Sequence, residues 1–272
     1  MPHEPAPAAA DFHDAVTRLQ LKLDGPTLAT AASRVGPVTL DGQLAFLKVT
    51  NEPEELAGAL ALESWDGNGA VRVLAHDGNA FLMERGGRTV RAAVPDDGAA
   101  AAVLCAVVAR LHEHSPADLE GFVSLRHWFG SLFCDVTPRF DRLRTIADKL
   151  LDRAGPVVLL HGDIHHENVL ELRRGGQLHW LAIDAKGIVG PREFDYCNIF
   201  TNWTRSDAVR YFDIRVASVS RLADIDRTQL LRWIACWSAL SGIWHLEDGN
   251  TGAAAFPHAV MDLALDRLSR IG

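Results

Sequence analysis

The sequence has few of the features that mark secreted, membrane-spanning and metal-scaffold proteins. Only four of its 272 residues are cysteine (Cys105, Cys134, Cys197 and Cys236), and none of these forms a Cys-x-x-Cys pair. The opening residues, MPHEPAPAAADFHD, lack the basic and apolar regions of a secretory signal. No run of about 18 apolar residues occurs. We therefore expect reduced thiols, a cytoplasmic location and no membrane span.

Basic residues are also fewer than acidic ones. The 27 basic residues are outnumbered by 35 acidic ones, which gives a formal net charge of −8. Nucleic-acid-binding domains usually carry a basic surplus, so we expect no nucleic-acid partner. An acidic balance is compatible with a polar or cationic small molecule as partner, although most surface acids are simply solvated. The composition is that of a globular protein, and it leaves the oligomeric state open.

The stretch 157–187 contains two apolar runs that each end on polar residues. Val157–Leu160 leads into a His-Gly-Asp segment that ends at Asp163, and Asn168 follows five residues later. The second run, Leu178–Ile183, ends on Asp184. An apolar run that ends on an acid places a carboxylate at the end of a strand. The spacing matches the kinase catalytic loop H-R-D-x-x-x-x-N, followed by a hairpin and a second metal-binding Asp.

This pattern predicts the transfer of a phosphoryl group from a nucleotide to an alcohol. Asp163 is the candidate catalytic residue, since it could orient or deprotonate the attacking hydroxyl. Asn168 and Asp184 are the candidate Mg²⁺ ligands, and an Asn adds no negative charge beside the phosphates. His161 is expected to brace the loop. Asp195 could hydrogen-bond the backbone of the catalytic loop or, equally, cap a helix.

Three histidines suggest a second interpretation, a zinc site. His161 and His165 have the i, i+4 spacing of metal ligands on a helix, and His166 follows directly. The HExxH motif is nevertheless absent, because no histidine stands at position 170. Gly162 also disfavours a helix at this point. We therefore favour phosphoryl transfer over zinc chemistry.

Lys48 lies inside the apolar run Leu44–Val49, where a lysine is either a solvent-facing residue or a phosphate clamp. A glutamate on the following helix could hold such a lysine over the phosphates of a nucleotide. The residues that compete for this role are Glu52, Glu54, Glu55 and Glu63. Most of them would also be favourable at a helix N-terminus without any catalytic role.

The hydrophobic pattern predicts an α+β chain of two lobes. A short helix at 12–23 precedes strands at 28–32, 37–40 and 44–49, a helix ending at Trp65, and strands at 70–75 and 80–83. Helices are expected at 98–114, 139–154, 207–223, 228–246 and 257–271. We predict an N-terminal nucleotide-binding lobe, 1–86, with a five-stranded antiparallel sheet, one helix and a loose segment at 1–11. A larger helical lobe, 87–272, would carry the catalytic hairpin and bind the substrate.

The acceptor is expected between the catalytic loop and the C-terminal helices. A guanidinium-bearing acceptor would require carboxylates and aromatic faces. Trp244, Glu247 and Asp248, at the end of a predicted helix, are candidate substrate contacts. Trp233 and Trp237 are four residues apart and are better explained as the core stripe of that helix.

Two segments, HGDIHHENVL (161–170) and LAIDAKGIVG (181–190), resemble the signature of the aminoglycoside phosphotransferase family. That family has the protein-kinase-like fold. WDGNGAVR (65–72) and the segment Leu82–Glu84 resemble its streptomycin 6-phosphotransferase and hydroxyurea phosphotransferase branch. The resemblance covers residues 40–205 and is weak in the C-terminal helices. Branch members often have Pro where this chain has Ala185, and the N-terminal end is short for the family.

The resemblance implies ATP- and Mg²⁺-dependent phosphorylation of a hydroxyl on a small molecule, with a streptomycin-type aminoglycoside as the leading acceptor and antibiotic resistance as the role. Asp163 would be the catalytic Asp, and Lys48 would bind the phosphates of ATP. Glu55 would pair with that lysine, and Glu84 would belong to the nucleotide-binding hinge. The metal ligands would be Asn168 and Asp184.

Two alternatives remain open: a kinase for another small metabolite or hydroxyurea, and a pseudokinase that binds nucleotide without transferring phosphate. The joint presence of Lys48, Asp163, Asn168 and Asp184 disfavours the pseudokinase, since a non-catalytic protein does not need all four.

Overall fold

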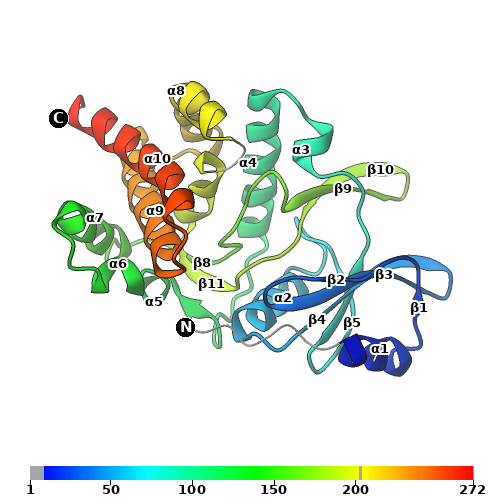
Figure 1. Ribbon diagram of the computed structural model, residues 1–272. Coiled ribbons are helices and arrows are strands. Elements are labelled where there is room, and N and C mark those ends of the chain that lie inside the picture. The colour runs from blue at the N-terminus through cyan, green and yellow to red at the C-terminus, as the bar shows by residue number, and fades with distance from the viewer. Residues whose placement is uncertain (1–8, 202–203, 272) are drawn as a thin grey trace.

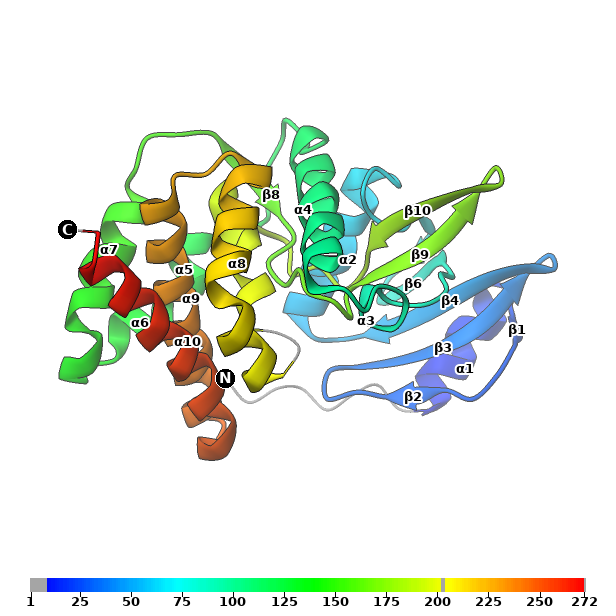
Figure 2. The ribbon, with the colours of Figure 1, turned by 90° about the horizontal axis from the view of Figure 1, so that it is seen from above.

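The structure is a computed structural model that describes residues 9–201 and 204–271. A sheet-rich lobe lies beside a larger helical lobe (Figures 1 and 2). The main sheet contains β1 (Lys22–Leu23), β2 (Leu28–Ala29), β3 (Ser33–Leu40), β4 (Gln43–Thr50), β5 (Val73–Asp77) and β6 (Ala80–Glu84). Its order is β1-β3-β4-β6-β5, with β2 also paired to β3, and all its pairs are antiparallel.

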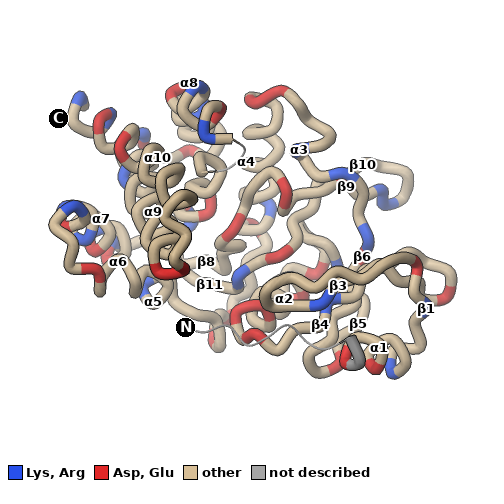
Figure 3. Tube along the Cα trace, viewed as in Figure 1, with Lys and Arg blue, Asp and Glu red and all other residues tan. Residues whose placement is uncertain are grey.

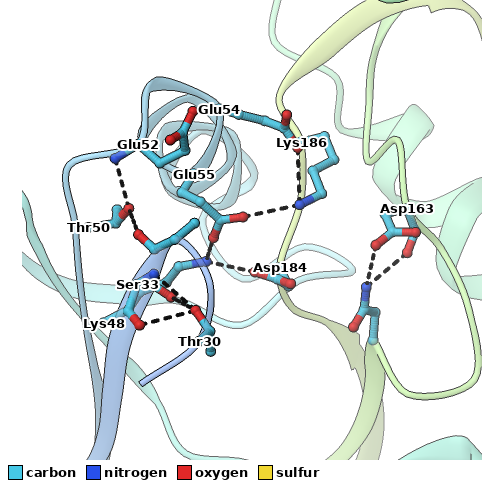
Figure 4. A network of polar contacts seen from close by, with 12 residues as sticks. Thr30, Ser33, Lys48, Thr50, Glu52, Glu54, Glu55, Asp163, Asp184 and Lys186 are labelled. Atoms are coloured by element: carbon cyan, nitrogen blue, oxygen red, sulfur yellow. Dashed lines mark hydrogen bonds and ion pairs between the residues drawn. The ribbon is translucent and has the colours of Figure 1, made fainter. Parts of the chain in front are cut away.

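Strand β4 shows how the alternation of side chains places Lys48. Ala45, Leu47 and Val49 point to one face of the sheet and pack in a small core with Phe12 of α1 (Ala9–Arg18). Because side chains alternate along a strand, Lys48 points to the opposite face. Helix α2 (Pro53–Trp65), which follows β4, contributes Glu55 on that same side (Figure 4).

The helical lobe is built around α9, which packs along the whole of α10. Its helices are α3 (Val90–Ala93), α4 (Asp97–Glu113), α5 (Leu125–Trp128), α6 (Gly130–Cys134), α7 (Asp141–Leu151), α8 (Arg205–Ala223), α9 (Arg227–Glu247) and α10 (Thr251–Ser269). Within the described residues, no helix is long and apolar enough to cross a membrane.

Two small sheets bring the catalytic segments together. One is the hairpin of β9 (Val169–Arg174) and β10 (Gln177–Ala182), and the other contains β7 (Val123–Ser124), β11 (Ile188–Pro191) and β8 (Val157–Leu160). The segment after β8 enters β9, and the segment after β10 enters β11, which runs antiparallel to β8. Ile183 N donates to Asn168 O at 2.9 Å, and Lys186 N donates to His161 O at 2.7 Å. The two loops are therefore joined backbone to backbone.

Most predicted elements are present, but four details were wrong. The main sheet has six strands rather than five, because the pair of residues that forms β1 is too short to show a periodic pattern. Helix α1 runs from Ala9 to Arg18, so residues 9–11 of the segment expected to be loose are helical, and residues 1–8 of that segment lie outside the described residues. The described part of the small lobe therefore has two helices, α1 and α2, rather than one. Helix α10 begins at Thr251, with Pro257 inside it.

Candidate active site

A cavity of about 590 Å³ lies between the sheet and the catalytic loops. Its wall is formed by the β2–β3 turn, β4, α2, the segment that follows β6, and the loop after β10. Lining residues include Ala31, Lys48, Glu55, Gly86 and Asp184. The volume is within the range of sites for cofactors and small ligands.

Lys48 is the centre of a partly buried network of charges on one side of this cavity (Figure 4). Its Nζ lies 2.6 Å from Asp184 Oδ1 and pairs with Glu55 Oε2. The other carboxylate oxygen of Glu55 accepts from Lys186 Nζ at 3.1 Å, and Lys186 also contacts Glu54 at 3.2 Å. Of the candidate glutamates, Glu55 is therefore the one in contact with Lys48. Its carboxylate is shared between two cations.

The surroundings of Asp184 determine both its backbone conformation and its charge. Its φ of 61° is in the left-handed region, which turns the chain sharply between β10 and β11. Burial disfavours the charged form, but Lys48 and Lys186 outweigh it and lower the pKa of Asp184 below its usual value. The carboxylate is therefore ionised at neutral pH, as a metal ligand must be.

Two amides hold the Asp163 side chain. Asn168 Nδ2 donates to Asp163 Oδ2 at 3.1 Å and to its backbone oxygen at 3.0 Å. Asn198 Nδ2 donates to Oδ1. His165 Nε2 is more distant, at 3.7 Å from Oδ2. The Asp163 side chain is 27% exposed, so an acceptor hydroxyl can reach it.

Asn198 did not emerge from the sequence as a site residue. It belongs to the short 3₁₀ helix η3 (Asn198–Phe200) and is 8% exposed. The available signal was an amide inside the otherwise apolar run Tyr196–Phe200. A buried polar group in such a run has to hydrogen-bond to a partner, which here is Asp163.

The backbone of the catalytic loop is braced by Asp195. Its Oδ1 accepts from Gly162 N at 2.8 Å, and its Oδ2 accepts from His161 N at 2.9 Å. His112 Nε2 lies 2.8 Å from the same Oδ2. Of the two roles left open by the sequence, the structure shows the loop-bracing one for Asp195.

His161 has both ring nitrogens occupied inside the protein. Its Nδ1 accepts from Asp163 N at 3.2 Å, so that Nε2 carries the proton and donates to Ile183 O at 2.9 Å. Burial lowers the pKa of His161, which keeps the ring neutral as this arrangement requires. Neither nitrogen is left to bind zinc, so the geometry favours the bracing role.

Helix α2 touches the Asp184 loop backbone to backbone. A Cβ at Gly58 would lie less than 3.0 Å from Ala185 O, and a Cβ at Gly187 would lie less than 3.0 Å from Ala57 O. Gly187 also has a φ of 60°, which a larger residue would adopt only with strain. Glycine at both positions therefore lets α2 and the loop approach closely. This contact fixes Glu55 relative to Asp184.

Asn168 and Asp184 suit a magnesium ion that also binds a nucleotide. Both residues border the cavity. The Asn168 amide nitrogen faces Asp163, so its amide oxygen is the atom that could bind the cation. Within the ranges 9–201 and 204–271, no three side chains of His, Cys, Asp or Glu form a metal cage. Magnesium bound together with a nucleotide does not need one, because phosphate oxygens and water complete its coordination.

Glu84 borders the cavity, but its carboxylate points to the β9–β10 hairpin. It accepts from Arg174 Nε at 3.1 Å and from Arg72 N at 2.8 Å. Basic residues lie along this hairpin (Figure 3). A nucleotide at this end would therefore meet the backbone of the segment that includes Gly86 and Gly87 rather than the Glu84 carboxylate.

None of the three predicted acceptor contacts is among the residues that line this cavity. Trp244 packs edge-on against Trp128 and Trp237, with ring centroids 5.4 and 5.6 Å apart. Glu247 accepts from Ser131 Oγ at 3.1 Å, and Asp248 caps the end of α9. Trp233 and Trp237 are buried, as their spacing indicated.

Comparison with known sequences identifies several relatives. Residues 18–249 match the family described as aminoglycoside/hydroxyurea antibiotic resistance kinase. The chain is 37% identical over 266 residues to streptomycin 3''-kinase of Klebsiella pneumoniae, covering 93% of this chain and 98% of the relative. It is 34% identical over 274 residues to streptomycin 6-kinase of Streptomyces griseus, covering 91% of this chain and 86% of the relative. Hydroxyurea phosphotransferase of Kitasatospora aureofaciens is 32% identical over 269 residues, covering 92% of this chain and 76% of the relative.

Solved structures share the fold. An aminoglycoside phosphotransferase in complex with AMP-PNP and hygromycin B superposes with a TM-score of 0.60 at 17% identity, over 90% of this chain and 94% of the other. A choline/ethanolamine kinase family protein from Mesorhizobium loti superposes with a TM-score of 0.63 at 15% identity, over 91% of each chain. The two-lobed, protein-kinase-like fold predicted from the sequence is thereby confirmed.

Proposed function

The chain belongs to the aminoglycoside/hydroxyurea antibiotic resistance kinase family, whose members are ATP-dependent phosphotransferases, and we propose that its acceptor is streptomycin. Two relatives named for streptomycin support this choice, at 37% and 34% identity. They match over nearly the whole of this chain, including the helical lobe that would bind the acceptor. The relative named for hydroxyurea is 32% identical, which makes hydroxyurea the alternative to test.

ATP would occupy the cavity with its phosphates near Lys48. In the structure this lysine is paired with Asp184 and Glu55, and a phosphate could take the place of one carboxylate while Glu55 keeps the lysine in position. The β2–β3 turn, closed by Thr30 N donating to Ser33 O at 2.8 Å, would cover the phosphates. The adenine would lie toward Glu84–Gly87, which also borders the cavity. We take this segment as the hinge between lobes 1–86 and 87–272.

Mg²⁺ would bind between Asn168, Asp184 and the phosphates. When bound, it would neutralise phosphate charge and so assist departure of the ADP. The contribution of the protein is to present one ionised carboxylate and one neutral amide at the edge of the cavity. The lowered pKa of Asp184 keeps that carboxylate available at neutral pH.

Asp163 would act on the acceptor. In Figure 4 Asp184 lies between Lys48 and Asp163, so the phosphate-binding lysine and the base flank the metal-binding carboxylate. The acceptor hydroxyl would donate its hydrogen bond to Asp163, and its oxygen would attack the γ-phosphorus as the bond to the ADP oxygen breaks. Asp163 would take up the proton as the new ester forms. We infer that this reaction takes place in the cytoplasm.

A panel of acceptors tests the proposal. ADP release from ATP and Mg²⁺ is measured with streptomycin, other aminoglycosides, hydroxyurea and simple sugars. We expect turnover that depends on streptomycin and is lost in Asp163→Asn, and mass spectrometry of the product then separates the 3'' from the 6 position. Turnover with hydroxyurea alone would move the assignment to that acceptor. Retained ATP binding without turnover on any acceptor would support a pseudokinase.

A further inference from the structure

Asn198 holds Asp163 from outside the catalytic loop. It lies 35 residues after Asp163 in the sequence, yet its amide donates to Asp163 Oδ1. Asn168, within the loop, donates to the other oxygen at 3.1 Å. The plane of the carboxylate is thus set by two donors that belong to separate segments. A single donor would leave the group free to rotate.

Two further hydrogen bonds connect Asn198 to the helical core. Thr201 Oγ1 lies 2.6 Å from Asn198 Oδ1, and Trp237 Nε1 of α9 lies 3.2 Å from the same hydroxyl. The backbone oxygen of Asn198 is a more distant acceptor for Thr201 Oγ1, at 3.4 Å. Trp237 is 6% exposed, and its ring packs edge-on against Phe194 with centroids 5.4 Å apart. The far end of this chain of hydrogen bonds is therefore held in the core.

The groups at the two ends determine the direction of every bond between them. An indole N–H can only donate, and an ionised carboxylate can only accept. Trp237 therefore donates to Thr201, whose own proton is directed to Asn198 Oδ1. The nitrogen of the Asn198 amide is then the atom that faces Asp163. If the amide were turned over, two oxygen acceptors would face each other without a proton between them.

We propose that Trp237, Thr201 and Asn198 form a one-way hydrogen-bond relay that positions the Asp163 carboxylate toward the acceptor hydroxyl. The inference rests on the proposed role of Asp163 in catalysis. Asn198 acts through Asp163 and is a positioning residue. The relay also gives Trp237 a second role besides packing, since the core of the helical lobe orients the base through it.

Substitutions at Thr201 test the relay with little change in volume. Thr201→Val replaces the hydroxyl by a methyl group, and we expect kcat to fall about tenfold, as the loss of one hydrogen bond to a buried partner implies. KM for ATP should remain within about twofold, because the nucleotide cavity is untouched. Thr201→Ser keeps the hydroxyl and should restore kcat to within about threefold of the parent chain. Ser238→Ala, which removes a buried α9 hydroxyl with no partner among the described residues, is the matched control.

Asn198→Leu provides a second measurement. It keeps the approximate volume of the side chain but removes the amide that donates to Asp163, so kcat should fall at least about tenfold while KM for ATP stays within about twofold. Adding Thr201→Val to Asn198→Leu should cause little further loss of kcat, because both substitutions break the same chain of hydrogen bonds, whereas two independent structural effects would add. If Asp163→Asn is inactive while Thr201→Val and Asn198→Leu keep the parent kcat, the relay is refuted. If Asp163→Asn itself is active, the proposed role of Asp163 fails instead.

Discussion

Replacing Gly58 by alanine should disrupt the contact between α2 and the metal-binding loop. Ordinarily this substitution stabilises a helix by about 1 kcal/mol. Here the new Cβ would lie less than 3.0 Å from the backbone oxygen of Ala185, next to Asp184, so the helix or the loop must move. Overpacking costs about 1–3 kcal/mol, and the upper part of that range, about 2–3 kcal/mol, applies because the clash is with backbone rather than a flexible side chain. After the helix gain is subtracted, the net destabilisation should be about 1–2 kcal/mol. For a chain of this size, that lowers Tm by about 2–8 °C.

The functional effect of Gly58→Ala should exceed the effect on stability. A loop displaced by a fraction of an ångström shifts Asp184 relative to Lys48, and misplacement by about 1 Å can cost about 100-fold in rate. Thermal unfolding and steady-state kinetics on the same samples measure both quantities. Gly252→Ala is the matched control, since Gly252 lies in α10 with no atom within 4 Å of the added Cβ. A Gly58→Ala protein as stable and active as the control would refute the tight contact.

Three further outcomes follow from the charges at the site. Lys186→Gln removes one of the two cations that hold Glu55, so KM for ATP should rise several-fold, whereas Glu54→Gln should have a smaller effect; steady-state kinetics measure both. Asp184→Asn should raise the Mg²⁺ concentration for half-maximal rate at least about tenfold, because the amide is a weaker ligand for a hard cation; a magnesium titration of ADP release checks this. Burial lowers the pKa of His166 to about 3, so below about pH 6.5 the unfolded chain binds a proton that the folded chain does not. The free energy of unfolding should therefore fall toward acid pH, by up to about 1.4 kcal/mol per pH unit, and His166→Gln should flatten this dependence in urea unfolding.

The sequence was most informative where a few local residues carry both the fold and the chemistry. The spacing of Asp163, Asn168 and Asp184 predicted the loop and hairpin correctly, because Asp163 and Asp184 follow strands whose apolar runs are easily seen, and Asn168 directly precedes β9. Lys48 was found for a similar reason, since a cation inside an apolar strand is conspicuous. In the structure Lys48, Asn168 and Asp184 line one cavity, and Asn168 hydrogen-bonds to Asp163.

Contacts between residues far apart in the chain were harder to predict from the local sequence. Glu55 was singled out only through the family resemblance, since nothing local distinguishes it from its neighbours, and the structure shows that it is the glutamate paired with Lys48. Asn198 reaches Asp163 from the 3₁₀ helix η3, 35 residues later in the sequence. Trp244 packs against Trp128 and Trp237, and its contact with the acceptor stays a prediction, because an aromatic residue at a helix end has no local signal that separates a pocket wall from a core.

The transfer of labelled γ-phosphate from ATP to streptomycin, measured side by side in the parent protein and Asp163→Asn, tests the central claim most directly. Nucleotide affinity is measured in the same samples. We expect label in streptomycin with the parent protein and, with Asp163→Asn, loss of label while ATP still binds. Equal transfer by both proteins would contradict the assignment of Asp163 as the residue that acts on the acceptor hydroxyl.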